Sequence, residues 1–113
     1  MLEERREHVR IAYSGVIFIS WKTFQGDHNH VLGRCHDVSE AGVGLALSAR
    51  IPAGSFVKVK AYGLNVDCSA IVRRIIRRPG GYVLGLTLSK PLDQAVLAEL
   101  SAGRSEWAVS TSA

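Results

Sequence analysis

Apolar and polar residues alternate along several short segments of this 113-residue chain. The clearest case is residues 56–62, in which Val57 and Val59 alternate with Lys58 and Lys60. A period of two is typical of a strand with one face in the core and the other in water. Runs of apolar residues bounded by turn residues, the first of them rich in β-branched and aromatic residues, predict five further strands at residues 11–21, 31–37, 43–47, 65–78 and 82–88.

Turn-forming residues separate these segments. We expect residues 24–30 to form the loop of a first hairpin and residues 79–81, Pro-Gly-Gly, to form a tight second hairpin. Pro52 and Gly54 lie in a longer connection, residues 48–55, between the strands expected at residues 43–47 and 56–62. Gly15 lies inside the first predicted strand, where it indicates a kink or a bulge.

The pattern changes after the last strand. Pro91 fits the first turn of a helix, and one apolar face follows it, formed by Leu92, Val96, Leu97 and Leu100. We therefore expect a helix that packs on the sheet and ends near Gly103. Six strands and a closing helix predict an all-β domain built as a six-stranded antiparallel β-barrel with one C-terminal α-helix, since closure removes exposed strand edges.

The length and the distribution of apolar residues favour one domain with charged or polar ends. Residues 1–10 are highly charged and lack an amphipathic period, so we expect a mobile arm that a ligand would order. Residues 11–103 form the barrel and its helix, and residues 104–113 are expected to be a disordered tail. The charged start is unlike a signal peptide, and no apolar run reaches the ~20 residues of a membrane span, which predicts a cytoplasmic protein without membrane insertion.

Charge is unevenly distributed over the chain. Its 14 basic and 10 acidic residues give a net charge of +4. Arginines cluster at residues 5, 6 and 10 and again at residues 73, 74, 77 and 78, which favours an anionic partner, although a solvated basic surface is the alternative. Cys35 and Cys68 lie in separate strand-like runs, so a disulfide framework is not expected.

Two short motifs narrow the choice of partner. Arg6 and Arg10 form an RxxxR pair, and Asp37, Ser39 and Gly42 form a DxSxxG turn further along the chain. Their order on an all-β background resembles the PilZ domain family. That resemblance spans residues 5–100 and implies a barrel of the split-barrel type and a bacterial receptor for cyclic di-GMP. Leu88 departs from the family pattern, because relatives usually have Phe at the end of this strand.

The arginines suit the ligand that the resemblance implies. A guanidinium can donate two parallel hydrogen bonds to phosphate oxygens or to guanine O6 and N7, and its flat face can stack on a purine. Arg6 and Arg10 are therefore expected to clamp the ligand from one side as the arm closes. The alternative is a solvated leader in which Glu3, Glu4 and Glu7 are local partners of the arginines.

The second motif has a matching chemistry. The Asp37 carboxylate can accept from guanine N1 and N2, the Ser39 hydroxyl can reach a phosphate or a backbone group, and Gly42 permits a turn with positive φ. The alternative is that Asp37 and Ser39 only cap the turn between two strands.

Two further arginines are implied as ligand residues by the resemblance. An arginine at the position of Arg5 tends to accompany two intercalated ligand molecules, so we expect two cyclic di-GMP molecules per domain. Arg74 stands where some relatives place a tryptophan against the ligand, and its guanidinium could stack on a guanine or lie on an exposed strand face.

Other functions are less well supported by the sequence. The metal-capable residues His28, His30, Cys35 and His36 lack a paired-ligand spacing, so no metal or cofactor is expected. The acidic residues are scattered and no nucleophile motif occurs, which argues against an enzyme. A barrel that binds RNA or single-stranded DNA would need aromatic residues on one strand face, whereas Phe18, Trp21, Phe56 and Tyr82 are spread over several strands. The sequence thus predicts a cyclic di-GMP receptor that signals to an unidentified protein partner, with a degenerate PilZ domain used only for protein contacts as a third possibility.

Overall fold

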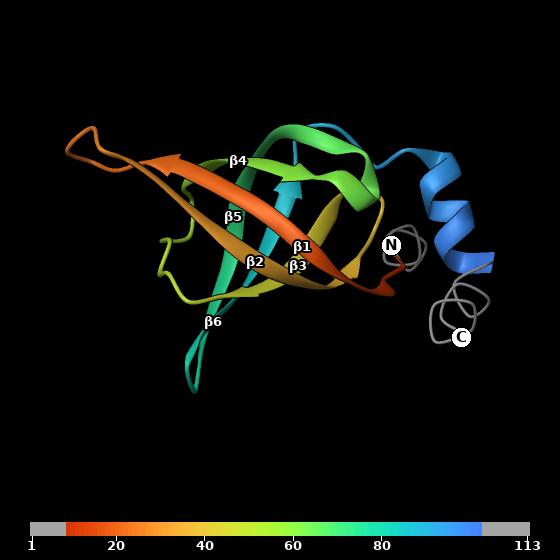
Figure 1. Cartoon of the computed structure of the whole chain (residues 1–113), viewed down its shortest axis with the longest axis horizontal. Coiled ribbons are helices and arrows are strands. Elements are labelled where there is room, and N and C mark those ends of the chain that lie inside the picture. The colour runs from red at the N-terminus through yellow and green to blue at the C-terminus, as the bar shows by residue number, and fades with distance from the viewer. Residues whose placement is uncertain (1–8, 103–113) are drawn as a thin grey trace, which may run out of the picture.

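The computed structural model describes residues 9–102 and has a closed barrel of six antiparallel strands, followed by a helix at residues 94–102 (Figure 1). The strands are β1 (Ile11–Lys22), β2 (His28–Val38), β3 (Gly42–Leu47), β4 (Phe56–Ala61), β5 (Val66–Arg78) and β6 (Gly81–Leu88). Their order around the barrel is β1-β2-β3-β6-β5-β4, and β4 pairs with β1 to close it. The predicted barrel with a C-terminal helix is confirmed.

The predicted alternation places apolar side chains inside the barrel. On β4, Val57 and Val59 are buried whereas Lys58 and Lys60 are exposed, as the sequence pattern indicates. Each strand contributes to the same cluster of buried side chains, and Leu64 of the short 3₁₀ helix η1 (Tyr62–Leu64) joins it. The interior is therefore one continuous apolar core.

The first hairpin is longer than the sequence predicts. Lys22 still pairs with His28, so the loop expected at residues 24–30 is shorter and its second half belongs to β2. Backbone hydrogen bonds close the turn, from Thr23 N to Asp27 O (2.7 Å) and from Gly26 N to Thr23 O (2.9 Å). Strand pairing satisfies the backbone of polar residues as well as of apolar ones, which is why polarity alone placed the loop wrongly.

The helix begins later than predicted. Pro91 lies in the connection after β6, and the helix starts at residue 94. Asp93 caps it, because its Oδ1 accepts a hydrogen bond from the backbone N–H of Ala95 at 2.9 Å. The expected apolar face packs against the barrel through Leu92, Val96, Leu97 and Leu100.

Three register shifts interrupt the strand pairing. One lies between Ala12 and Gly15 on β1, where the sequence indicates a kink or bulge. The others lie between Cys35 and Asp37 on β2 and between Val72 and Arg74 on β5. An additional residue in one strand lets two consecutive side chains face the same side of the sheet. The second and third shifts position the candidate site.

Both cysteines are free, and Cys35 is buried. Within residues 9–102, no helix is long and apolar enough to cross a membrane.

Candidate functional site

The bulge in β2 turns two polar side chains to the outside of the barrel. Cys35 and Val38 are both buried in the core, and His36 and Asp37 lie between them. Regular alternation would have turned Asp37 inward and Val38 outward. Because His36 is the additional residue in the pairing with β3, Asp37 instead faces the outer surface.

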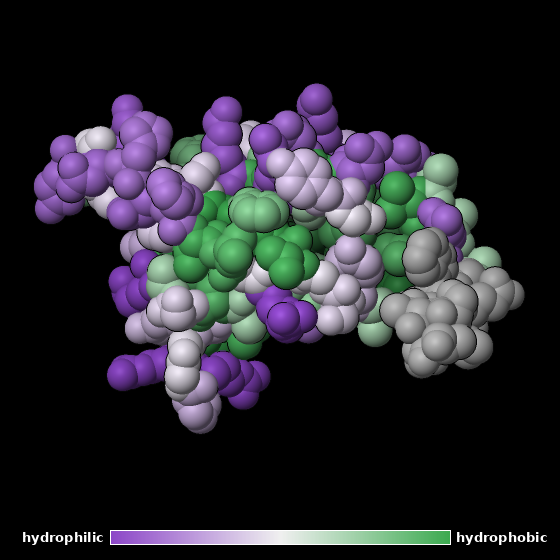
Figure 2. All heavy atoms as spheres, viewed as in Figure 1, coloured by the Kyte–Doolittle hydropathy of each residue, from purple (hydrophilic) through white to green (hydrophobic). Residues whose placement is uncertain are grey.

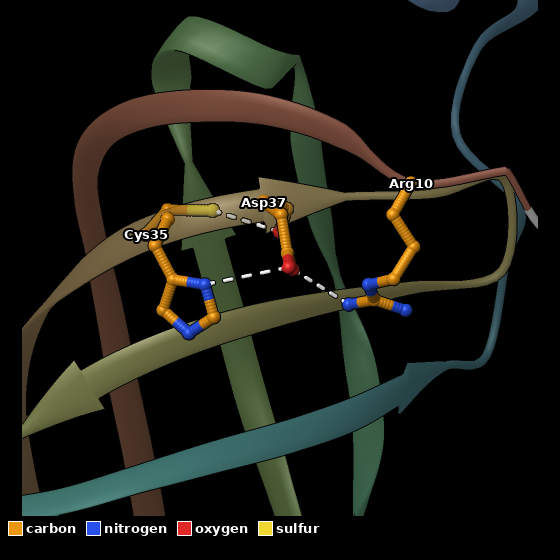
Figure 3. Close-up of polar contacts among 4 residues, drawn as sticks. Arg10, Cys35 and Asp37 are labelled. Atoms are coloured by element: carbon orange, nitrogen blue, oxygen red, sulfur yellow. Dashed lines mark hydrogen bonds and ion pairs between the residues drawn. The ribbon is translucent and has the colours of Figure 1, made fainter.

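Asp37 is the centre of a small polar cluster (Figure 3). Arg10 Nη2 donates to Asp37 Oδ1 at 2.7 Å, and His36 Nδ1 lies 3.4 Å from Asp37 Oδ2. The hydrogen bond from Arg10 lowers the pKa of the Asp37 carboxyl below its ordinary value and raises the pKa of Arg10. The cluster therefore presents a charged carboxylate and a charged guanidinium at neutral pH.

Cys35 supports this cluster from inside the barrel. Its Sγ lies 3.4 Å from the backbone carbonyl oxygen of Asp37, and burial raises the pKa of its thiol to about 12. A neutral, buried thiol is a poor nucleophile and a poor metal ligand. Cys35 is thus part of the packing beneath the site.

The turn after β2 brings the chain back into β3. The backbone N–H of Ser39 donates to the carbonyl oxygen of Gly42 at 2.8 Å, and Ser39 is only 2% exposed. Gly42 does not have the positive φ expected from the sequence. A glycine is needed at this position for lack of space, because a Cβ there would collide with the backbone carbonyl oxygen of Leu86 on β6.

One row of paired residues runs across four strands beside this turn. Asp37 pairs with Gly44, Gly44 pairs with Gly85, and Gly85 pairs with Arg74. A Cβ at Gly44 would lie 2.5 Å from Asp37 Oδ1 and 2.7 Å from His36 Cε1. Side chains of Asp37 and His36 thus lie over Gly44 and that of Arg74 lies over Gly85, so the two glycines, which we call the glycine floor, let the Asp37 cluster and Arg74 lie close to the sheet.

The bulge in β5 presents arginines on the other side of the glycine floor. Arg73 and Arg74 are both exposed between the inward-facing Val72 and Ile75. Arg74 extends over Gly85, with guanidinium atoms 3.9 Å from the position that a Cβ would occupy. Arg73 Nε donates to Thr87 Oγ1 at 3.2 Å, which holds that side chain on β6.

This arrangement suits a flat anionic molecule. Guanidinium groups at both ends can bind phosphates, and a carboxylate between them can accept from a base. Three inter-strand spacings separate Asp37 from Arg74, about 14 Å along the sheet. Among residues 9–102 no group of three or more His, Cys, Asp or Glu side chains could hold a metal ion.

Most of the predicted site residues lie on this face. Arg10, Asp37 and Arg74 line it, and Ser39 and Gly42 form the turn at its edge. Arg5 and Arg6 fall outside the described residues, so their roles stay predictions.

Sequence reasoning missed His36, Arg73 and the glycine floor. The signal for the bulges was present, because the polar doublets His36-Asp37 and Arg73-Arg74 each interrupt an apolar alternation. No comparable signal pairs Gly44 with Gly85, since they lie on strands that are not consecutive in the chain.

Comparison with known proteins agrees with this fold. No curated protein matches the chain. Among solved structures, the inhibitor of motility MotI (DgrA) of Bacillus subtilis is similar, with 18% sequence identity and a TM-score of 0.60 over 86% of this chain and 48% of that one. The PilZ domain of YcgR from Escherichia coli, solved with c-di-GMP, has 17% identity and a TM-score of 0.56 over 86% of each chain.

A further structure, of Escherichia coli YcgR in complex with c-di-GMP, has 19% identity and a TM-score of 0.56 over 96% of this chain and 47% of that one. The chain therefore spans about half the length of MotI and of this YcgR chain. At these identities the likeness shows the fold. The sequence profile described as PilZ domain matches residues 4–103, nearly the whole chain, and the chain accordingly belongs to the PilZ domain family.

Proposed function

We propose that this protein is a receptor for cyclic di-GMP and binds it over the glycine floor. The observation that carries the proposal is the row in which the Arg10–Asp37 ion pair and Arg74 flank two glycines on one outer face. Membership of the PilZ family and the structures of YcgR with c-di-GMP support the choice of ligand.

The proposed contacts follow from the chemistry of each group. Arg10, together with Arg6, binds phosphate oxygens, and Asp37 accepts from the N1 and N2 donors of a guanine. Arg74 stacks on or hydrogen-bonds to the second guanine. Ser39 and Gly42 hold the turn that fixes Asp37 in place.

The ion pair does not have to break when the ligand binds. Arg10 has five N–H donors, and its side chain is 46% exposed although one nitrogen already donates to Asp37. It can therefore bind Asp37 and a phosphate at the same time. The pair then acts as a preorganised element. Removing both residues should therefore weaken binding by an amount that differs from the sum of the two single removals.

Calorimetric titration with cyclic di-GMP, compared with GTP and a DNA oligomer, tests the assignment. Arg6→Ala, Arg10→Ala and Asp37→Ala should each weaken binding by about 2 kcal/mol, or about 30-fold in Kd. Lys60→Ala, which removes an exposed cation from a different outer face, is the matched control and should change Kd little. Unchanged affinity in all three variants would exclude this site, and equal affinity for the DNA oligomer would favour a nucleic-acid-binding barrel.

We propose further that two cyclic di-GMP molecules bind as an intercalated pair. Arg5 supplies an additional guanidinium for the second molecule, as the family resemblance implies. Replacing Arg5 by Leu should shift the calorimetric stoichiometry from two towards one. Saturation of the unmodified protein at one equivalent would contradict this stoichiometry without affecting the assignment of the ligand.

The signal proposed for a partner protein is closure of the N-terminal arm over the bound ligand. The ion pair at Arg10 is half-exposed, and pairs of this kind contribute only ~0.2–1 kcal/mol, too little to hold a terminal segment alone. Amide hydrogens of residues 3–10 should exchange quickly without ligand and become protected at saturation, while β1 from Ile11 to Phe18 and all of β6 change little. Equal protection in both states would exclude arm closure as the signal.

A further inference from the structure

A second outer face of the barrel carries large apolar side chains that the fold leaves exposed. They lie on β1, β2 and η1, and their exposed fractions are 46% for Val16, 43% for Phe18, 58% for Leu32 and 73% for Tyr62. We call these four residues the apolar patch. Figure 2 shows hydrophobic residues gathered over the middle of β1 and β2, with hydrophilic residues around them.

Strand pairing makes the apolar patch contiguous. Phe18 pairs with Leu32 on one side and with Lys60 on the other, and its ring packs edge-to-face against Tyr62 with centroids 5.8 Å apart. A groove of about 740 Å³ opens over these residues and extends along β4. Phe18, Leu32 and Tyr62 therefore line one hollow in the surface.

The core does not account for the apolar patch. The inward neighbours on β1, Ile17 and Ile19, are fully buried, so β1 already contributes its inner face to the interior. Solvation of four clustered apolar side chains is unfavourable, and contiguous exposed patches rimmed by polar residues are typical of interaction surfaces.

The rim of the apolar patch is basic. Lys58 and Lys60 on β4 and His30 and Arg34 on β2 are exposed beside it. Strands β1 and β4 contain no acidic residue, and the one carboxylate that lines the groove, Asp67 of β5, lies 3.9 Å from Lys60 Nζ. A complementary surface must therefore combine apolar side chains with carboxylates.

Two other occupants fit this face less well. A second copy of the chain would place one basic rim against another. Single-stranded nucleic acid would need a row of aromatic rings for stacking, whereas two of the four patch residues, Val16 and Leu32, are aliphatic.

We propose that the apolar patch docks a segment of a partner protein whose apolar side chains are flanked by Asp or Glu. The partner's apolar residues fill the groove beside Phe18 and Leu32, and its carboxylates pair with Lys58 and Lys60. This goes beyond the proposed nucleotide site, because it uses a different face and stands even if cyclic di-GMP does not bind.

The test uses two amphipathic peptides of the same length, with leucine and phenylalanine on one face and either glutamate or lysine on the other. NMR titration of the isotope-labelled full chain should show shifts of β1, β2 and β4 amides with the glutamate peptide and not with the lysine peptide. Lys58→Glu combined with Lys60→Glu should weaken binding of the glutamate peptide roughly tenfold or more. Lys90→Glu, a change of the same charge beyond β6, is the matched control.

A second pair of variants tests the apolar contribution. Phe18→Ser and Leu32→Ser should each reduce binding of the glutamate peptide, whereas Ile76→Ser, at a residue 40% exposed on β5, should not. The amide spectrum of each variant shows whether the barrel is still folded.

Several outcomes would overturn the proposal. These are equal binding of both peptides, absence of binding, shifts confined to other strands, the same amides shifting with a thymidine oligomer, or self-association that occupies the patch as protein concentration rises. Titrations with and without cyclic di-GMP separate this result from the nucleotide assignment, which calorimetry tests independently.

Discussion

The two outer faces of this barrel are built in opposite ways. Over β3 and β6 the outward residues are small, and Gly42 and Gly44 are buried although they lie on the outer side of the sheet. Charged side chains reach across them from bulges in the neighbouring strands. Over β1, β2 and β4 many outward residues are large, and Val16, Phe18 and Leu32 among them remain exposed.

The two faces differ in what constrains the identity of their residues. On the glycine face three residues are constrained within the chain: a Cβ at Gly42 would meet the backbone of β6, a Cβ at Gly44 would meet the Asp37 carboxylate, and Asp37 pairs with Arg10. Such a face is preformed and suits a small ligand that needs fixed geometry. On the face with the apolar patch the fold constrains little, so the identity of its residues is better explained by a partner outside the chain.

The largest effect should come from closing the space at Gly42. In Gly42→Ala the new Cβ meets the carbonyl oxygen of Leu86, which cannot rotate away, so the free energy of unfolding should fall by about 3 kcal/mol. Ala46→Val adds volume at an exposed position of the same strand and should have little effect. Urea denaturation of both variants measures the difference, and similar stabilities would mean that β3 and β6 are not so tightly apposed.

A change at Gly44 should affect the ligand more than the fold. Because the Cβ of Gly44→Ala overlaps Asp37 Oδ1, the carboxylate must move away from Arg10, and affinity for cyclic di-GMP should fall by about 2 kcal/mol. Calorimetry measures the affinity, with Ala46→Val again as the control. Retained affinity would show that the position of Asp37 in this structure is not the one that the ligand requires.

The Arg10–Asp37 ion pair should make stability depend on pH. The pKa of Asp37 is lowered in the folded state, so its contribution is complete above the unfolded pKa of about 4 and is lost as the pH falls through the folded pKa. The pair is partly exposed, which limits the effect to about 0.5 kcal/mol.

Asp37→Asn should therefore be less stable than the unmodified protein near neutral pH and equally stable in strong acid. Denaturation of both proteins at the two pH values measures the difference. Asp67→Asn on the face with the apolar patch is the control, since Asp67 is 77% exposed and lies 3.9 Å from its partner. A difference for Asp37→Asn that persists in acid would show that the effect does not come from the charge.

The smallest effect on stability is expected at the apolar patch. Leu32→Ser removes a side chain that is 58% exposed, so the free energy of unfolding should change by no more than about 0.5 kcal/mol. Urea denaturation measures this as well. A loss as large as that of Gly42→Ala would mean that Leu32 stabilises the fold, and the contrast between the two faces would disappear.

The sequence alone determined the fold class and the residues singled out as a candidate site. Alternation on residues 56–62 and the turn residues between segments indicated the strands, because a half-buried strand requires a period of two. The motifs singled out Arg10 and Asp37, and the structure joins them in an ion pair that the sequence did not predict. The sequence was less exact at element ends, as at the first hairpin and at Pro91, where backbone pairing and the Asp93 cap decide the boundary.

Only the tertiary structure decided which residues meet on each face. The glycine floor exists because β3 pairs with β6, a strand far along the chain, and no local pattern specifies that pairing. Residues 16–19 are all apolar, so their sequence has no alternation to show that Val16 and Phe18 point outward while Ile17 and Ile19 point inward. Register settles such a segment, since shifting a strand by one residue exchanges the buried and the exposed face.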